Sequence, residues 1–167
     1  MPTPLVTPKG HQQLKDELHY LWRELRPQIT EKVSWAASLG DRSENADYKE
    51  NKAKLRQIDK RIRYLQKRLD QLKIVEPNPV QFGQVFFGAW VTLTNLDTDE
   101  QLRLQIVGYD EIFDRKDAIS IDSPMARALL KKHVDDEVTV KTQTKATDWL
   151  IEAIDYKTTE RADQIGK

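Results

Sequence analysis

Apolar residues recur at helical spacing through the first 40 residues of the chain. Four leucines at spacings of four, three and four form one stripe, which is typical of an amphipathic helix. They are Leu14, Leu18, Leu21 and Leu25. Thr7 before Pro8 predicts the helix start. The stripe continues out of phase beyond Pro27, which predicts a kink or stutter there, and Gly40 predicts the stop.

A second apolar pattern follows with heptad spacing and no slip. Its members are Tyr48, Asn51, Leu55, Ile58, Ile62, Leu65, Leu69 and Leu72. Such a seam indicates a coiled coil, in which the polar Asn51 is of the kind that fixes register. Because few residues separate the two helices, residues 1–75 are expected to form an antiparallel hairpin. Some 30 residues at about 1.5 Å each make an arm about 45 Å long.

Beyond residue 75 the period changes from that of helices to that of strands. Residues 76–80 hold two prolines and predict a linker. Five strands are expected, with one capped helix at 122–132; the strands fall at 85–93, 102–109, 118–121, 137–143 and 149–156. Residues 81–157 thus predict a small antiparallel sheet domain, which makes the chain α+β. Residues 158–167 are expected to be a disordered tail.

Charge divides the chain in the same place as the periodicity. Residues 1–75 hold 16 Lys and Arg against 10 Asp and Glu, and residues 76–167 hold 11 against 17. A basic first module is suited to a polyanion. The chain holds no cysteine, its start has no apolar leader run, and no apolar segment is long enough to span a bilayer. We expect a cytoplasmic protein with no membrane contact.

The positive charge concentrates on the second helix. Its members are Lys49, Lys52, Lys54, Arg56, Lys60, Arg61, Arg63, Lys67, Arg68 and Lys73. One interpretation is the solvated outer face of a hairpin, and the other is contact with a phosphate backbone. No aromatic residue interleaves on that face, so base stacking is not expected. The three histidines are scattered and predict no metal site, and no pattern indicates nucleophilic catalysis.

The turn between the helices carries Asp41, Glu44 and Asp47 within seven positions. The spacing of Asp41 and Glu44 is that of a capping box, with Asp41 as the N-cap of the second helix. Alternatively, the two carboxylates are ligands. They are too few for a complete site, because a hard cation needs more oxygen donors than two side chains supply. They could complete a Mg²⁺ site that another molecule begins.

Four segments of the sequence resemble the bacterial Gre transcript-cleavage factors, and the GreB branch more than the GreA branch. The segments are WAASLGDRSENADY, VFFGAWV, IVGYDEIF and ISIDSPMARALLKK. The match runs from about residue 5 to residue 157, in order. The resemblance implies a coiled-coil arm that enters the secondary channel of a backtracked bacterial RNA polymerase. It also implies an FKBP-like domain that docks at the channel rim.

The same resemblance implies roles for individual residues. Asp41 and Glu44 match the family's acidic pair, which helps the polymerase hold a second catalytic Mg²⁺ so that a water cleaves the nascent RNA near its 3′ end. Neighbouring matches imply support of the tip; they are Arg42, Ser43, Asn45, Asp47 and Tyr48. The docking signature falls on Asp122, Ser123 and Pro124, where Ser123 and Pro124 also predict a capped helix.

The expected protein is therefore a monomeric accessory factor that rescues arrested polymerase, not an enzyme by itself, and that binds no cofactor alone. Its basic helix faces RNA or the walls of the channel. Other classes stay open. A plain nucleic-acid-binding hairpin would bind free RNA with a steep salt dependence. A purely structural coiled coil would use its tip only as a cap, and a polymerase inhibitor could share the same architecture.

Overall fold

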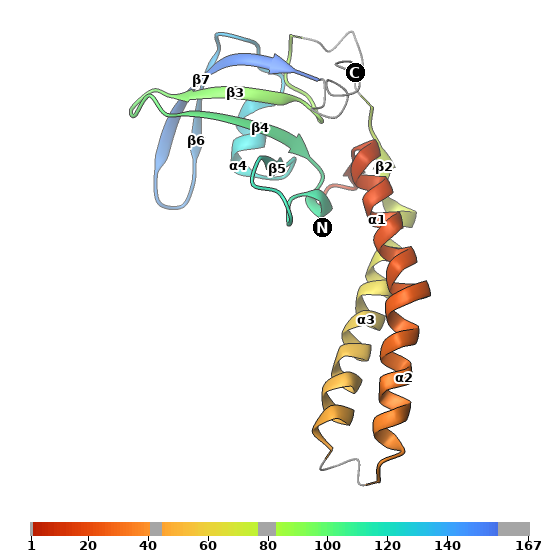
Figure 1. Cartoon of the computed structure of the whole chain (residues 1–167). Coiled ribbons are helices and arrows are strands. Elements are labelled where there is room, and N and C mark those ends of the chain that lie inside the picture. The colour runs from red at the N-terminus through yellow and green to blue at the C-terminus, as the bar shows by residue number, and fades with distance from the viewer. Residues whose placement is uncertain (1, 41–44, 77–82, 157–167) are drawn as a thin grey trace, which may run out of the picture. The chain divides into compact units, whose positions relative to one another are not determined.

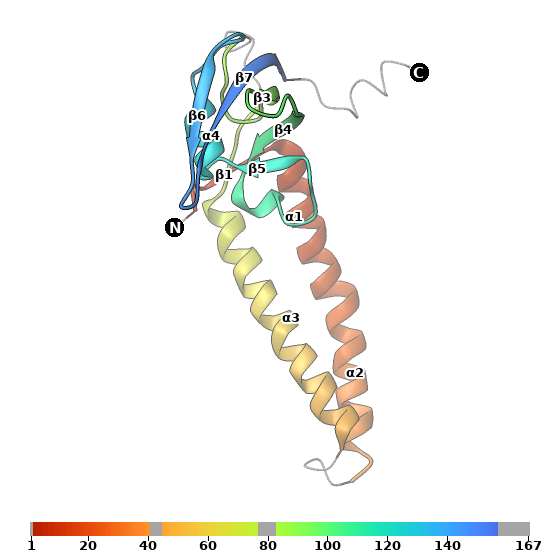
Figure 2. The same ribbon diagram turned by 90° about the vertical axis from the view of Figure 1, so that its left-hand side faces the viewer.

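The computed structural model describes residues 2–40, 45–76 and 83–156, which form two compact units. One unit is the helical hairpin His11–Leu72, and the other combines Met1–Gly10 with Lys73–Lys167. Three helical segments precede the turn of the hairpin: α1 (Pro8–Tyr20), η1 (Leu21–Leu25) and α2 (Arg26–Ala37). They run side by side with, and antiparallel to, the returning helix α3 (Ala46–Gln71) (Figures 1 and 2).

The expected change of winding near Pro27 is confirmed, and it lies one turn earlier. The segment η1 is a turn of π-helix, in which the backbone N–H of Arg26 donates to the carbonyl of Leu21. Pro27 has no N–H and its ring crowds the carbonyl four residues before it, so a widened turn accommodates it. The extra residue shifts the apolar phase, which explains why the leucine stripe does not continue in register.

The hairpin buries its seam along both partners. In the helical segments before the turn, the buried seam residues are Leu14, Leu21, Ile29 and Ala36. In α3 they are Ile58, Ile62 and Leu65. The remaining predicted seam positions of α3 are half-buried. The register-fixing role expected of Asn51 stays a prediction. Its side-chain amide donates to the carbonyl of Asp47 within its own helix, at 2.9 Å, because that acceptor lies one turn back.

The second unit is built on a five-stranded sheet with the order β5–β4–β3–β7–β6. The strands are β3 (Trp90–Asn95), β4 (Gln101–Val107), β5 (Ala118–Ser120), β6 (Glu137–Lys141) and β7 (Ala146–Asp155). The α+β class is confirmed, with one difference: β5 pairs parallel to β4, so the sheet is mixed. Parallel neighbours need a connection that crosses back before the second strand begins. Between β4 and β5 this connection contains a 3-10 turn, η3 (Tyr109–Glu111).

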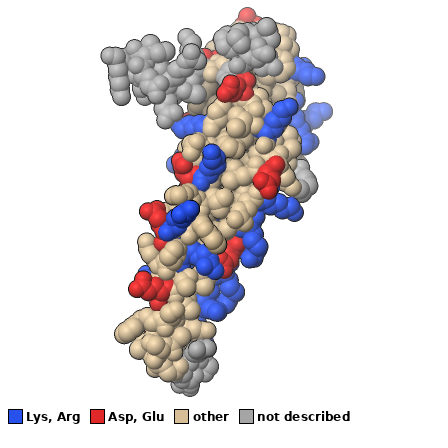
Figure 3. Space-filling view, turned by 90° about the vertical axis from the view of Figure 1, so that its right-hand side faces the viewer, with Lys and Arg blue, Asp and Glu red and all other residues tan. Residues whose placement is uncertain are grey.

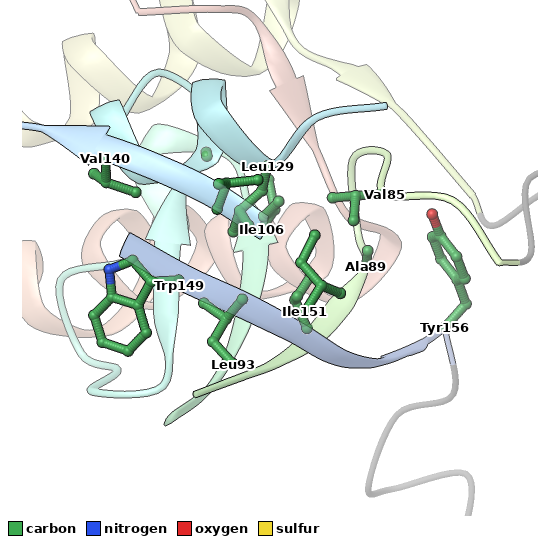
Figure 4. Close-up of a cluster of buried hydrophobic side chains, with 12 residues drawn as sticks. Val85, Ala89, Leu93, Ile106, Leu129, Val140, Trp149, Ile151 and Tyr156 are labelled. Carbon is green, nitrogen blue, oxygen red and sulfur yellow. The ribbon is translucent and has the colours of Figure 1, made fainter. Parts of the chain in front are cut away.

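A single apolar cluster joins the strands to the helix α4 (Pro124–Leu129). Figure 4 shows side chains from four strands and α4 gathered in it; those labelled on these elements are Leu93, Ile106, Leu129, Val140, Trp149 and Ile151. Leu93, Ile106 and Ile151 are fully buried. Alternation along β6, with Val138 and Val140 inward, accounts for its half-buried pattern.

The first residues of the chain are fastened to the sheet unit. The short strand β1 (Leu5–Val6) pairs in parallel with β2 (Lys73–Ile74). The buried carboxylate of Glu111 accepts from the Thr7 hydroxyl, from the Thr7 amide at 3.1 Å and from the Gly108 amide at 2.7 Å. Thr7 also caps α1 as predicted, since its Oγ1 accepts from the Gly10 amide at 3.0 Å. No described helix has the length and hydrophobicity of a membrane span.

Candidate functional site

The two helix ends at the tip of the hairpin are joined by one side chain. The Asn45 side-chain oxygen accepts from the backbone N–H of Tyr48 at 3.0 Å, which caps α3. The same amide donates to the carbonyl of Ala36, in the last turn of α2, at 2.7 Å. Asn45 thus satisfies the free Tyr48 donor at the start of α3 and adds a second hydrogen bond to the Ala36 carbonyl, which also accepts from the Leu39 amide at 3.2 Å. It therefore holds the end of α2 close to the start of α3.

The prediction that Asp41 is the N-cap of the second helix is wrong. The helix starts at Ala46, and its cap is Asn45, four positions later than expected. A carboxylate can accept the amide of the helix but cannot donate to the carbonyl of Ala36, whereas an asparagine does both. The signal in the sequence was an N-cap residue directly before a helical run, which the acidic spacing of Asp41 and Glu44 obscured.

The predicted tip residues divide into two groups. Asp41, Arg42, Ser43 and Glu44 lie outside the described residues, between Gly40 and Asn45. Asp47 lies exposed in the first turn of α3, where a negative charge suits the positive end of the helix dipole. The Tyr48 ring is half-buried, and the ammonium of Lys52 lies 6.0 Å from its centroid. On the other side Gly40 adopts φ of 115°, a conformation that favours glycine.

Five of the predicted basic residues form one exposed stripe on α3. They are Lys49, Arg56, Lys60, Arg63 and Lys67. Their spacings of seven, four, three and four keep them on one side of the helix. Within the described part of the chain none of the five has a hydrogen-bond or ion-pair partner. The stripe runs about 27 Å at 1.5 Å per residue, and it leads toward the tip.

Three other predicted basic residues, Lys52, Lys54 and Arg61, have contacts within the hairpin. Arg61 makes two hydrogen bonds to Glu17, at 2.8 and 2.9 Å, and its guanidinium lies 5.3 Å from the Tyr64 ring centroid. Lys54 pairs with Glu50, one turn away, at 3.3 Å. Arg61 and Lys54, together with Lys52 beside the Tyr48 ring, are therefore held in place by neighbours. Figure 3 shows Lys and Arg distributed along the arm on the face in view.

The predicted docking residues lie at the start of α4. Ser123 caps the helix as expected, accepting from the Ala126 amide at 3.1 Å, and Pro124 is exposed in the first turn. Both oxygens of Asp122 are engaged by Thr3, whose amide donates at 2.8 Å and whose hydroxyl donates as well. These contacts lower the pKa of Asp122 below its ordinary value. Sequence reasoning missed Thr3, because nothing in local spacing relates it to residue 122.

The described residues contain no candidate metal centre. Across 2–40, 45–76 and 83–156, no group of three or more His, Asp or Glu side chains is arranged to hold a metal ion. The distinctive arrangement is therefore the arm itself. It combines a continuous stripe of unpaired cations with a turn that is closed by Asn45 and that carries Asp41 and Glu44 in its sequence.

Comparison with known proteins agrees with this architecture. Residues 4–74 match the family model "Transcription elongation factor, N-terminal", and residues 79–156 match "Transcription elongation factor, GreA/GreB, C-term". The chain is 59% identical over 156 residues to transcription elongation factor GreB of Pseudomonas putida, covering 93% of this chain and 96% of that protein. It is 60% identical over 158 residues to GreB of Vibrio cholerae, covering 94% and 98%.

Among solved structures, the GreA factor homologue Gfh1 of Thermus thermophilus is 25% identical, with a TM-score of 0.41 over 90% of this chain and 97% of that one. The two family models together span nearly all of the chain, and the GreB relatives match it over almost their full length. This protein therefore belongs to the GreA/GreB family of transcription elongation factors.

Proposed function

We propose that this protein binds bacterial RNA polymerase as a monomer and stimulates cleavage of backtracked nascent RNA near its 3′ end. In this proposal the bond-breaking activity belongs to the polymerase, and the chain is an accessory factor that acts in the cytoplasm. One observation carries the proposal: a two-helix arm bears a stripe of cations that have no ion-pair partner among the described residues, and the stripe leads to a segment with two acids in its sequence. Membership of the elongation-factor family supports RNA polymerase as the partner.

The narrowness of the arm supports insertion into a channel. The helix α3 has 26 residues, which makes about 39 Å at 1.5 Å per residue. A two-helix hairpin is too thin to enclose a large core, and its heptad seam packs the two helices against each other along the arm. The stripe from Lys49 to Lys67 lies along its outside, where it can follow the phosphates of an extruded RNA strand.

The acids of the tip have the chemistry to share a metal ion. Carboxylate oxygens are the ligands that Mg²⁺ prefers, and Asp41 and Glu44 supply part of an octahedral shell, the rest of which the polymerase would provide. A shared Mg²⁺ would supply Lewis-acid stabilisation of the phosphate and a more acidic bound water. The contribution of this chain is to bring the two carboxylates, while Asn45 holds the two ends of their turn together.

The sheet unit would hold the factor on the polymerase. The exposed start of α4, with Ser123 and Pro124, is the surface that the proposal assigns to docking. Asp122 supports that surface indirectly, because its contacts with Thr3 fix the loop before the helix. The basic arm and the docking surface therefore lie in separate units, one for reach and one for attachment.

Substitution of the tip acids tests this proposal. We expect Asp41→Asn and Glu44→Gln each to abolish the stimulated RNA cleavage in stalled elongation complexes, while binding to polymerase survives. Removing a charged ligand from a shared site weakens the hold on the ion, whereas docking uses the other unit. The measurement is the cleavage product on a gel, beside polymerase binding by anisotropy.

Glu50→Gln is a matched control, because Glu50 is exposed on the same arm and only pairs weakly with Lys54. We expect it to cleave like the unmodified protein. Wild-type cleavage by both tip variants would refute the assignment of the acids. Inhibition instead of cleavage by the unmodified protein would identify an inhibitor of the same architecture.

A further inference from the structure

A groove on the hairpin, formed between the first helices and α3, carries side chains that the proposed function does not use. Its volume is about 310 Å³. The lining consists of Lys15, Leu18, His19, Trp22, Arg23 and Gln66. It contains two permanent cations, a histidine, an amide and an indole, and no carboxylate. The indole of Trp22 is 53% exposed, so part of its ring surface is open to an occupant of the groove.

The cations of the groove differ from the paired arginines beside them. In the part of the hairpin that the structure describes, neither Lys15 nor Arg23 has a hydrogen-bond or ion-pair partner. Arg26, by contrast, is bound by Asp59 at 2.7 Å. Unpaired cations in one groove favour an anionic occupant, because such an occupant gains charge-assisted hydrogen bonds without breaking an internal pair.

Trp22 is fixed before any ligand arrives. The Arg26 guanidinium carbon lies 5.6 Å from the indole ring centroid, and Asp59 holds that guanidinium in place. This cation–π contact restricts the indole while leaving half of its surface open. A side chain that is already ordered loses little entropy on binding, so it is a good platform for a flat ligand.

We propose that this groove binds a nucleotide of single-stranded RNA. The base would stack on Trp22, Lys15 and Arg23 would contact the flanking phosphates, and Gln66 would reach the edge of the base. Stacking on an aromatic side chain beside cations is how proteins bind single strands without sequence preference. An acidic peptide would leave the indole unused, and an apolar peptide would leave both cations buried without partners.

The position of the groove sets which RNA can reach it. This step rests on the proposed function, because it takes the RNA to run back along the arm from the tip. Eighteen positions separate Trp22 from Gly40. At 1.5 Å per residue this is about 27 Å, or about eight nucleotides at 3.4 Å each in a stacked strand. RNA that is extruded by about eight nucleotides or more can therefore reach the groove, whereas a shorter extruded segment cannot.

Binding of an RNA octamer by the full chain tests the groove without polymerase. We expect Trp22→Ala to weaken the binding about fivefold or more by fluorescence anisotropy. Trp35→Ala is the matched control, since Trp35 is a 67% exposed indole of the same hairpin outside the groove, and it should bind like the unmodified protein. Equal affinity of Trp22→Ala and wild type, or equal losses in both variants, would overturn the proposal.

The salt dependence tests the role of the cations. Lys15→Gln combined with Arg23→Gln should reduce the slope of log affinity against log salt by about 1.4, because each phosphate contact on a single strand contributes about 0.7. An unchanged slope would exclude phosphate contacts in the groove. All of the substituted side chains are exposed, and circular dichroism confirms that each variant is folded.

Cleavage assays separate this inference from the proposed function. With two nucleotides extruded, Trp22→Ala should cleave like wild type, and with about eight it should cleave at least fivefold more slowly at limiting factor concentration. Equal defects at both lengths, or weaker binding to polymerase that carries no extruded RNA, would point to a protein contact and overturn the groove. Absence of cleavage by wild type would refute the proposed function alone, and the octamer experiment would still decide the groove.

Discussion

Asn45 shows how much of the tip geometry depends on a single side chain. Its oxygen receives the Tyr48 amide and its nitrogen reaches the Ala36 carbonyl, so it closes the ends of α2 and α3 at once. Aspartate would keep the first contact and lose the second, and alanine would lose both. The position thus calls for asparagine on physical grounds.

We expect Asn45→Ala to lower the free energy of unfolding by about 1–2 kcal/mol, since a lost N-cap alone costs about 1 kcal/mol. Asn45→Asp should cost less, because the cap acceptor is retained. The measurement is urea unfolding followed by circular dichroism. Stimulated cleavage should fall in both variants, as the turn with Asp41 and Glu44 loses the contact that holds its ends. Equal stability of all three proteins would show that the clamp contributes nothing.

At the scale of secondary-structure elements, the start of α1 is fitted closely against η3. A Cβ atom on Gly10 would lie 2.1 Å from Glu111 Oε1, an impossible approach. Glu111 has little freedom to withdraw, because it is buried and accepts from Thr7 and Gly108. The glycine is required here by close packing of the helix on a carboxylate.

Gly10→Ala is expected to destabilise the sheet unit by about 1–3 kcal/mol, the range typical of overpacking. Thermal unfolding monitored by tryptophan fluorescence measures this effect. A double-mutant cycle supplies the control: in a Glu111→Ala background the same substitution should cost much less, because the atoms that it meets are gone. If the two costs are equal, the clash with Glu111 is not the cause.

The π-turn η1 illustrates how one element adjusts to a local constraint. Pro27 cannot donate a hydrogen bond, and the helix widens just before it instead of breaking. Trp22 lies inside this widened turn, so the same distortion that accommodates the proline also places the indole over the groove. The periodicity predicted the change of winding. It did not predict that Trp22 in the widened turn would line a groove.

At the scale of the whole molecule, the start of the chain is joined to a distant loop within one unit. Thr3 and Asp122 are 119 positions apart, yet the threonine donates both its amide and its hydroxyl to the aspartate. This contact fastens the chain start to the loop before α4, and the β1–β2 pairing fastens it to the segment that follows the hairpin. The charge of the chain divides as well, since the basic surplus lies in residues 1–75 and the acidic surplus in residues 76–167.

The Thr3–Asp122 contact predicts a pH-dependent contribution to stability. Hydrogen bonds from Thr3 lower the pKa of Asp122 in the folded state, so the ionised form is the stabilising one. The contribution is complete above the ordinary carboxyl pKa of about 4 and is lost as the pH falls through the lowered value. We expect Asp122→Asn to cost about 1 kcal/mol at pH 7 and progressively less as the pH falls through the lowered pKa of Asp122.

Urea unfolding at several pH values measures this difference. Asp114→Asn is the matched control, because Asp114 is exposed in the same unit and has no hydrogen-bond or ion-pair partner among the described residues. Its stability difference from wild type should stay near zero throughout. A constant cost of Asp122→Asn from pH 7 to pH 2 would mean that the charge on Asp122 is not what binds Thr3.

The sequence by itself determined the hairpin, the change to strands after residue 75, the basic helix and the caps at Thr7 and Ser123. These features are local: apolar spacing of 3.5 or 2 residues decides which face is buried, and a cap needs only a few neighbouring residues. The family also followed from the sequence, since its motifs lie in order along the chain. The acidic pair at Asp41 and Glu44 was likewise visible, and its catalytic role stays a prediction.

Only the tertiary structure showed that Asn45, and not Asp41, is the N-cap of α3, where the end of α2 offers its amide an acceptor. It also joined Thr3 to Asp122, inserted the π-turn and gathered Lys15, Trp22 and Arg23 around one groove. Local spacing does not encode these contacts, because each depends on segments that come together only when the apolar faces are buried.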